Sequence, residues 1–125
     1  MNNDIRILCV DDEPNILSTL QRFFRRDNVQ LLLADSAEEA MKLLQEKGPV
    51  QIILSDYRMP GMNGVEFLQQ VHLLWPQTKG ILLSGFADLG AVSSAIDDDS
   101  IFRYVRKPWD RNELRGVIDE ALSLS

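Results

Sequence analysis

Short apolar segments alternate with longer segments of helical periodicity along the whole chain. The short segments are rich in β-branched or aromatic residues, and several of them give way to a polar loop. A pattern of this kind is typical of parallel strands separated by helices. The sequence predicts five strands, at residues 5–10, 29–33, 51–54, 80–83 and 102–105.

The segments between these strands carry the signals that begin and end helices. Pro14 occupies a favoured first helical position, and Ser36 with Glu39 forms the pattern of a capping box. Asp110 is a candidate N-cap with Glu113 at the matching position. Helices are therefore predicted after the first, second and fifth strands.

Two further helices complete the alternation. Apolar residues at helical spacing over 65–74 predict one helix, which ends at Trp75-Pro76, and a thinner stripe over 89–96 predicts a short one. Five βα units in succession specify an α/β fold with right-handed crossovers. The expected architecture is flavodoxin-like, with a five-stranded parallel sheet in the order 2-1-3-4-5 and helices on both faces.

Composition narrows the class of protein without identifying it. The 125 residues suffice for one domain, and the formal net charge of −6 argues against non-specific binding to nucleic acid or anionic membranes. The N-terminal residues lack a secretory signal and no apolar run reaches membrane-spanning length, so a cytoplasmic location is expected. Cys9 is the single cysteine, which excludes a disulfide framework within the chain.

Acidic and basic residues follow three of the predicted strands. Asp11 and Asp12 follow the first, Asp56 follows the third, and Lys107 follows the fifth. Side chains beyond the carboxyl ends of parallel strands gather in one crevice. Taken separately, Asp11 and Asp12 could be helix-capping charges and Asp56 a turn former. Their occurrence together with Lys107 favours a site for a divalent cation and a phosphoryl group.

Taken together and in their order along the chain, several motifs of this sequence resemble those of the receiver domains of two-component response regulators. The matching motifs are Asp11-Asp12, Asp56-Tyr57-Arg58-Met59-Pro60-Gly61-Met62-Asn63-Gly64, Ser84-Gly85, and Tyr104 with Lys107-Pro108. The resemblance implies that residues 1–125 form one receiver domain and that an output domain lies outside this chain. It also implies that Asp56 accepts a phosphoryl group from a sensor histidine kinase or a phosphotransfer protein. The domain would then be a phosphoacceptor with slow self-dephosphorylation rather than an enzyme.

Oxygen ligands for Mg²⁺ or Mn²⁺ are expected beside the phosphoacceptor. Asp12, Asp56 and the backbone carbonyl of Arg58 are the expected direct ligands, and Asp11 is expected to act through water. Lys107 is expected to pair with Asp56 at rest and with a phosphoryl oxygen afterwards, as a compact point charge can.

Two residues are expected to couple the site to the protein surface. The resemblance implies that Ser84 donates to a phosphoryl oxygen and that Tyr104 then moves from an exposed to a buried position. This movement would alter the face formed by the fourth helix, the fifth strand and the fifth helix, which could also support a homodimer. The family pattern further implies a cis bond between Lys107 and Pro108.

The resemblance implies that two large residues flank the path of the hydrolytic water. They are Arg58, two residues after Asp56, and Phe86, two residues after Ser84. Neither side chain helps to orient a water molecule. We therefore expect the aspartyl phosphate to last for tens of minutes or longer.

Other functions share parts of this pattern. A magnesium phosphohydrolase of the haloacid dehalogenase type also forms an aspartyl phosphate, but its two carboxylates follow the first strand and are separated by one residue. A flavin or nucleotide carrier would need a Gly-rich phosphate loop after the first strand, which this chain lacks. A receiver-like binding module that no longer uses phosphate is disfavoured because every charged site position is filled. The motifs also look like those of receivers joined to cyclic-dinucleotide phosphodiesterases or to enhancer-binding transcription activators.

Overall fold

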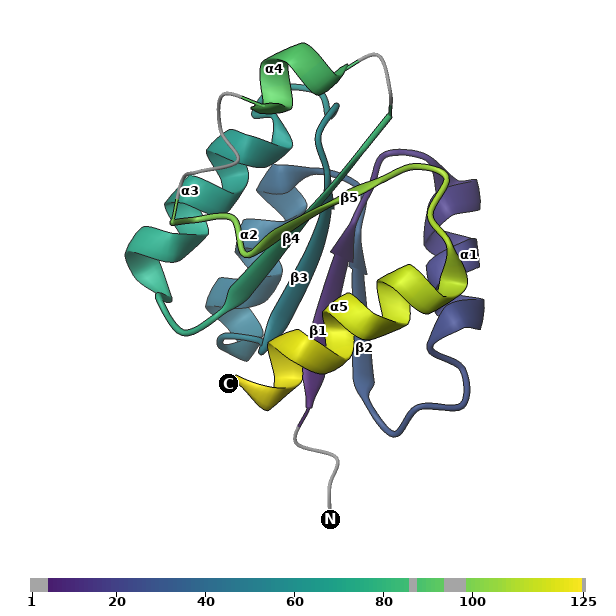
Figure 1. Cartoon of the computed structure of the whole chain (residues 1–125). Helices are drawn as coiled ribbons and strands as arrows, with labels where there is room; N and C mark the ends of the chain where they lie inside the picture. The colour runs from purple at the N-terminus through teal and green to yellow at the C-terminus, as the bar shows by residue number, and fades with distance from the viewer. Residues whose placement is uncertain (1–4, 86–87, 94–98, 125) are drawn as a thin grey trace.

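The computed structural model describes residues 5–85, 88–93 and 99–124. Its strands are β1 (Arg6–Val10), β2 (Gln30–Ala34), β3 (Ile52–Asp56), β4 (Lys79–Ser84) and β5 (Arg103–Arg106). They form one parallel sheet in the order β2-β1-β3-β4-β5, which confirms the predicted topology (Figure 1). Each strand begins and ends within two residues of its predicted bounds.

The strands β3 and β4 extend past their apolar residues. Asp56 is the last residue of β3 and pairs with Leu83, and Ser84 ends β4 opposite Arg106. The apolar pattern placed the ends of these strands at Leu54 and Leu83. The ladder continues because backbone pairing does not depend on the polarity of the side chains. The sheet itself therefore positions the side chains of Asp56 and Ser84.

Within the described residues, five helices surround the sheet. They are α1 (Pro14–Phe23), α2 (Ala37–Lys47), α3 (Gly64–Leu74), α4 (Leu89–Ser93) and α5 (Arg111–Ser123). The helices α1 and α5 cover one face of the sheet, and α2 and α3 cover the other (Figure 1). The predicted fourth helix included Ile96, which lies outside the described residues.

The predicted capping box before α2 is only half formed. The Ser36 side chain accepts a hydrogen bond from the Glu39 backbone at 3.1 Å, but the Glu39 carboxylate accepts from the backbone of Asp35 rather than of Ser36. A complete reciprocal box lies instead at the start of α3, where Asn63 and Glu66 exchange two hydrogen bonds. Asparagine is as good an N-cap as serine, so the spacing of Asn63 and Glu66 is enough to predict a capping box from the sequence.

The first and last helices begin as their sequences predict. The first turn of α1 contains Pro14, where the missing backbone N–H would have had no helical partner. The Asp110 carboxylate caps α5 by accepting hydrogen bonds from the backbone N–H groups of Asn112 and Glu113. This carboxylate therefore satisfies two of the four amide groups that a helix start leaves unpaired.

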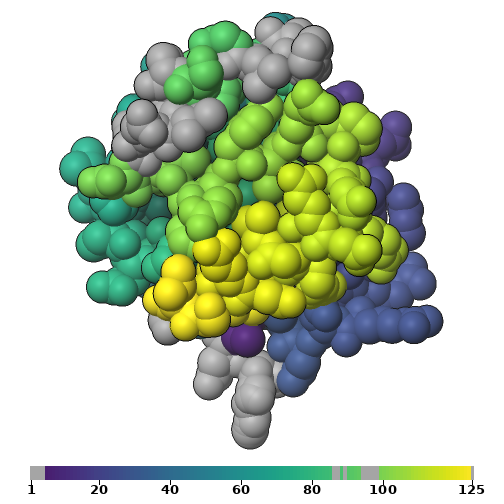
Figure 2. Space-filling model, in the orientation of Figure 1, coloured from purple at the N-terminus to yellow at the C-terminus, as the bar shows by residue number. Residues whose placement is uncertain are grey.

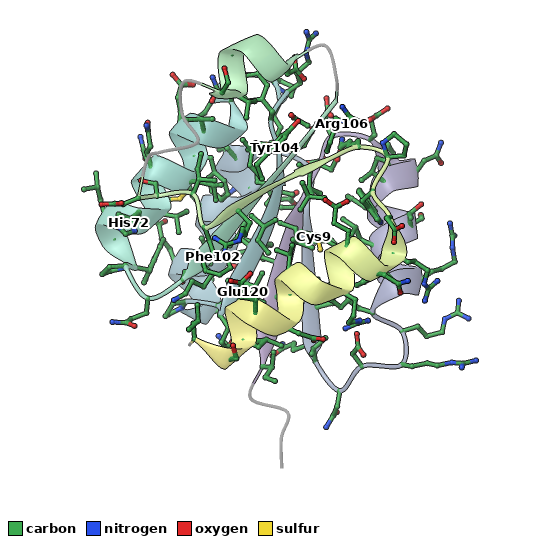
Figure 3. The ribbon with its side chains drawn as sticks, in the orientation of Figure 1. Cys9, His72, Phe102, Tyr104, Arg106 and Glu120 are labelled. Carbon is green, nitrogen blue, oxygen red and sulfur yellow. The ribbon has the colours of Figure 1, made fainter. Side chains whose placement is uncertain are left out.

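Two apolar layers hold the helices to the sheet. In β1, Leu8 and Val10 face the layer under α2 and α3, whereas Ile7 and Cys9 face the layer under α1 and α5. Because both faces are buried, the strands are apolar throughout rather than alternating. Figure 3 places Cys9 in the sheet behind α5, and this burial raises the pKa of its thiol far above the usual range.

One side of the molecule is formed by β5 and α5. Figure 2 shows α5 packed along the segment that contains β5, with no break between their surfaces. Arg103 of β5 and Glu120 of α5 form an ion pair across this boundary.

Among the described helices, none combines the length and the apolar character needed to cross a lipid bilayer.

Candidate functional site

Three carboxylates meet at the carboxyl edge of the sheet. Asp11 and Asp12 come directly after β1, and Asp56 ends the neighbouring strand β3. One oxygen from each carboxylate lies within 4.8 Å of the other two. Asp11 and Asp56 are 0% and 6% exposed, whereas Asp12 faces solvent. The cluster therefore has two buried charges and one open side.

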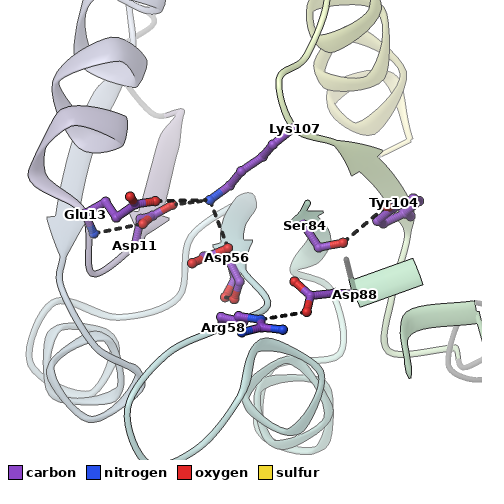
Figure 4. Close-up of polar contacts among 9 residues, drawn as sticks. Asp11, Glu13, Asp56, Arg58, Ser84, Asp88, Tyr104 and Lys107 are labelled. Atoms are coloured by element: carbon purple, nitrogen blue, oxygen red, sulfur yellow. Dashed lines mark hydrogen bonds and ion pairs between the residues drawn. The ribbon is translucent and has the colours of Figure 1, made fainter. Parts of the chain in front are cut away.

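Lys107 reaches this cluster from the loop after β5. Its Nζ atom lies 2.9 Å from Oδ1 of Asp56 and 3.0 Å from Oδ2 of Asp11, and the Glu13 carboxylate lies 4.0 Å away (Figure 4). The peptide bond between Lys107 and Pro108 is cis, as the family resemblance implied. One ammonium thus bridges the two buried carboxylates.

Burial is the largest single influence on the pKa values of Asp56 and Lys107, but it sets the direction of the shift only for Asp56. Removal from water raises the pKa of Asp56; the hydrogen bond from Lys107 opposes this effect, and the charges of Asp11 and Asp12 add to it. Burial also disfavours the charged form of Lys107, but its hydrogen bonds to Asp56 and Asp11 outweigh that effect and raise its pKa. Lys107 therefore stays positively charged at neutral pH, and one ammonium faces three carboxylates.

This donor set fits a small divalent cation. Mg²⁺ and Mn²⁺ prefer oxygen ligands, and Mg²⁺ keeps several of its waters when one or two carboxylates bind it. Asp12 lies at the solvent side of the cluster, where a hydrated ion can enter. A cation would also offset the excess negative charge. The assignment of the Arg58 backbone carbonyl as a further ligand stays a prediction.

A close backbone contact supports the end of β3. Gly64, the first residue of α3, lies so near Asp56 that a Cβ atom built on it would be 2.2 Å from the Asp56 carbonyl oxygen. The Gly64 backbone N–H also donates to the Tyr57 carbonyl at 2.8 Å. The start of α3 therefore packs directly against the backbone that carries Asp56. In the sequence Gly64 appears only as the last residue of the motif that begins at Asp56, because the partner of this contact belongs to another element.

Ser84 and Tyr104 contact each other beside the cluster. The Ser84 hydroxyl donates to the Tyr104 hydroxyl over 3.2 Å, and Figure 4 shows Ser84 between Asp56 and Tyr104. Ser84 is fully buried and Tyr104 is partly buried, between the exposed and the buried positions that the resemblance implied. The bond to Ser84 accounts for this position because it gives the tyrosine hydroxyl a partner inside the protein.

Arg58 makes an ion pair that the sequence pattern does not predict. Its Nε atom donates to Oδ1 of Asp88 over 2.7 Å, and Asp88 comes just before α4. Nothing in the sequence indicates a role for Asp88, because a separation of 30 residues from Arg58 carries no local signal. Phe86, the other predicted shield of the phosphoryl group, lies outside the described residues.

Comparison with known proteins agrees with this geometry. Residues 7–119 match the family model of the response regulator receiver domain. The chain is 36% identical over 116 residues to the hydrogenase transcriptional regulatory protein HoxA of Cupriavidus necator. It is 33% identical over 114 residues to the DNA-binding transcriptional regulator NtrC of Klebsiella pneumoniae. These alignments cover 93% and 91% of this chain but 24% of each relative. The chain thus spans about a quarter of the length of these curated relatives.

Solved structures show the same likeness in three dimensions. A signal receiver domain of an HD domain-containing protein from Pseudomonas fluorescens superposes with a TM-score of 0.90 at 34% identity, over 98% of this chain and 90% of that one. A response regulator receiver domain protein from Clostridium thermocellum gives a TM-score of 0.86 at 28% identity, over 95% and 94% of the two chains.

Proposed function

The chain belongs to the response regulator receiver domains, and from this premise we propose that Asp56 is the residue that accepts the phosphoryl group. The observation that carries the proposal is the bridge made by Lys107. Its ammonium contacts Asp56 and Asp11 at once, and Asp12 completes the cluster. Asp56 is therefore a nucleophile with a fixed cation and a candidate metal site beside it.

The proposed reaction transfers a phosphoryl group from a donor atom to the Asp56 carboxylate. A bond forms between a carboxylate oxygen of Asp56 and phosphorus while the bond between phosphorus and the donor breaks. The donor is a phosphohistidine of a sensor kinase or of a phosphotransfer protein. Positioning and charge neutralisation supply most of the catalysis in such transfers. Lys107 contributes a positively charged ammonium group, which can leave the Asp56 carboxylate and contact a phosphoryl oxygen instead.

Asp12 and Asp56 are the proposed direct ligands of Mg²⁺ or Mn²⁺, with the Arg58 carbonyl as a third and Asp11 acting through water. The bound ion would neutralise charge on the phosphoryl oxygens. The burial of Asp11 suits an indirect role, because its Oδ2 atom is already held by Lys107 and its Oδ1 atom accepts from the Glu13 backbone at 2.9 Å. Asp12 is exposed and free of such constraints on its approach to a hydrated ion.

Ser84 and Tyr104 are the proposed switch. The Ser84 hydroxyl has one proton to donate, and it now donates that proton to Tyr104. If Ser84 donates to a phosphoryl oxygen instead, the Tyr104 hydroxyl loses its partner and must find another. Tyr104 lies on β5, so its movement would change the face formed by α4, β5 and α5. We propose that this face contacts the output domain or a second copy of the domain.

We also propose that this receiver domain acts on an output domain, either fused to it or separate. The curated relatives are named as transcriptional regulators and are about four times as long as this chain, which supports a fused or separate output domain. Within such a protein, residues 1–125 would be the receiver domain and would work in the cytoplasm. The net charge of −6 does not favour direct binding of nucleic acid or membranes by the receiver itself.

Incubation with Mg²⁺ and acetyl phosphate tests the phosphoacceptor. We expect the mass of the protein to rise by one phosphoryl group, and we expect no rise for Asp56→Asn. Asp119→Asn is the matched control, because Asp119 is an exposed aspartate on α5. Modification of Asp56→Asn to the same extent as wild type would contradict the proposal. Continuous release of phosphate over many turnovers would instead indicate a phosphohydrolase.

The lifetime of the phosphorylated state is a separate proposal. Arg58 is expected to cover the phosphoryl group and to leave no ordered water in line for attack. We therefore expect phosphate loss after donor removal to take tens of minutes or longer, and Arg58→Asn to accelerate it. Each tenfold change in rate corresponds to about 1.4 kcal/mol in the barrier. Loss within seconds in the wild type would refute this shielding.

A further inference from the structure

Arg58 and Asp88 form an ion pair at the solvent side of the carboxylate cluster. The Nε atom of Arg58 donates to Oδ1 of Asp88 over 2.7 Å. The Arg58 side chain is 71% exposed and that of Asp88 is 9% exposed, so a buried carboxylate anchors a cation that extends into solvent. Both residues line a groove of about 560 Å³ together with Asp12. The pair therefore stands at an approach to the site.

Arg58 lies near a second possible acceptor. It follows Asp56 by two residues, and Figure 4 shows its guanidinium group joined to Asp88 in the same part of the site as Asp56. The hydrogen bond to Asp88 is the main cause that raises the pKa of Arg58, and the charge of Asp56 adds to it. The guanidinium thus lies in the field of both carboxylates, although it bonds to one of them.

A phosphoryl group would change the balance between these two acceptors. It carries more negative charge than a carboxylate and offers three acceptor oxygens. The planar guanidinium group can bind such oxygens through two parallel hydrogen bonds. Asp88 receives a single bond from Nε in this structure. A phosphoryl group on Asp56 is therefore the stronger partner for Arg58.

We propose that Asp88 is a positioning residue that holds Arg58 in the unphosphorylated domain, and that phosphorylation of Asp56 draws Arg58 away from Asp88 to the phosphoryl oxygens. This inference rests on the proposed role of Asp56. The exchange leaves the carboxylate of Asp88 buried without its cation, which is an unfavourable state. Asp88 directly precedes α4, so the exchange links occupancy of the site to the start of that helix.

The test measures how tightly the domain binds a phosphoryl analogue, beryllium trifluoride, in the presence of Mg²⁺. We expect Asp88→Asn to bind the analogue about fivefold more tightly than wild type, because Arg58 no longer has to leave a partner. The effect is modest because the Arg58 side of the pair is 71% exposed, and solvent weakens the coupling of an ion pair that is open on one side. Asp88→Glu keeps the carboxylate and should restore most of the wild-type affinity. Asp119→Asn removes an equal charge from the surface of α5 and should leave the affinity unchanged.

A double substitution shows whether Asp88 acts through Arg58. Between Arg58→Ala and Arg58→Ala/Asp88→Asn, we expect the affinity for the analogue to differ by less than about twofold. A direct readout is the NMR signal of the Arg58 Nε–H group. In the wild type this signal should shift when the analogue binds. In Asp88→Asn it should already be shifted without the analogue.

The outcomes separate this inference from the proposed function. If wild type binds no analogue while the fold is intact, both are overturned. If wild type binds the analogue and Asp88→Asn binds it no more tightly, only the role of Asp88 is overturned. An equal gain for Asp88→Asn with and without Arg58 would show a general charge effect, and it would also overturn the positioning role.

Discussion

Replacement of Gly64 by alanine tests how the start of α3 positions the phosphoacceptor. A Cβ atom at Gly64 would lie 2.2 Å from the Asp56 carbonyl oxygen, 3.0 Å from its carbonyl carbon and 2.9 Å from Cδ1 of Leu82. Real Cβ atoms essentially never approach another heavy atom within 3.0 Å. The backbone of α3 or of β3 must therefore move by about 0.8 Å, which is the gap between 2.2 Å and 3.0 Å.

The contact with backbone sets the magnitude. Extra atoms in a packed interior typically cost about 1–3 kcal/mol, and the Asp56 carbonyl cannot rotate out of the way as a side chain could. An alanine within a helix normally gains about 0.5–1 kcal/mol over glycine, which offsets part of the cost. We expect Gly64→Ala to lower the free energy of unfolding by about 2 kcal/mol. Because a misplacement of about 1 Å can slow catalysis by about 100-fold, phosphorylation should also slow by at least about tenfold.

Urea unfolding and the rate of phosphorylation by acetyl phosphate measure these two effects. Gly116→Ala is the matched control, because Gly116 lies on the exposed side of α5 and a Cβ atom there would meet nothing within 4 Å. We expect the control to be more stable than wild type by about 0.5–1 kcal/mol and to be phosphorylated normally. If Gly64→Ala gains stability as the control does and keeps its rate, the contact relaxes freely and our reasoning is wrong.

Three further predictions concern single carboxylates and the thiol. Without divalent cations, Asp12→Ala should melt at a slightly higher temperature than wild type because like-charge repulsion is removed. Added Mg²⁺ should raise the melting temperature of the wild type only. An equal rise in the variant would contradict the assignment of Asp12 as a metal ligand. The pKa of Asp56 is raised in the folded state above its ordinary value of 3.8, so the ionised carboxylate opposes folding at pH 8 and Asp56→Asn should be the more stable protein there. Because the folded protein regains its proton as the pH falls through the raised pKa, the stability difference in urea without divalent cations should narrow towards pH 3.8, and a constant difference would count against the burial argument. Burial also raises the pKa of Cys9, so thiol reagents should label it only as fast as the protein unfolds; rapid labelling of the native protein would show that this region of the sheet opens.

Local patterns were sufficient for most of the architecture. Each strand and each of the longer helices could be predicted because apolar periodicity and capping residues act over a few neighbouring positions. Pro14 and Asp110 begin their helices as predicted for this reason. The prediction failed locally at Ser36 and Glu39, where the Glu39 carboxylate bonds to Asp35 instead. It also overlooked the box at the start of α3, whose residues carry an equally local signal.

The composition of the site could also be predicted, but for a different reason. Asp11, Asp12, Asp56 and Lys107 each follow a strand, and parallel strands bring their carboxyl ends to one edge. Chain order and topology therefore place these residues near one another before any side chain is positioned. The roles that we propose for them still depend on the phosphorylation and metal-binding experiments.

The sequence by itself determined the alternation of elements, the order of the sheet and the edge at which charged residues gather, because these follow from local periodicity and the handedness of crossovers. Only the tertiary structure decided which groups touch. The pairing of Arg58 with Asp88, the bond from Ser84 to Tyr104 and the contact of Gly64 with the Asp56 backbone join different elements. Such contacts depend on how helices and loops settle against the sheet to within an ångström, and no spacing along the chain encodes that.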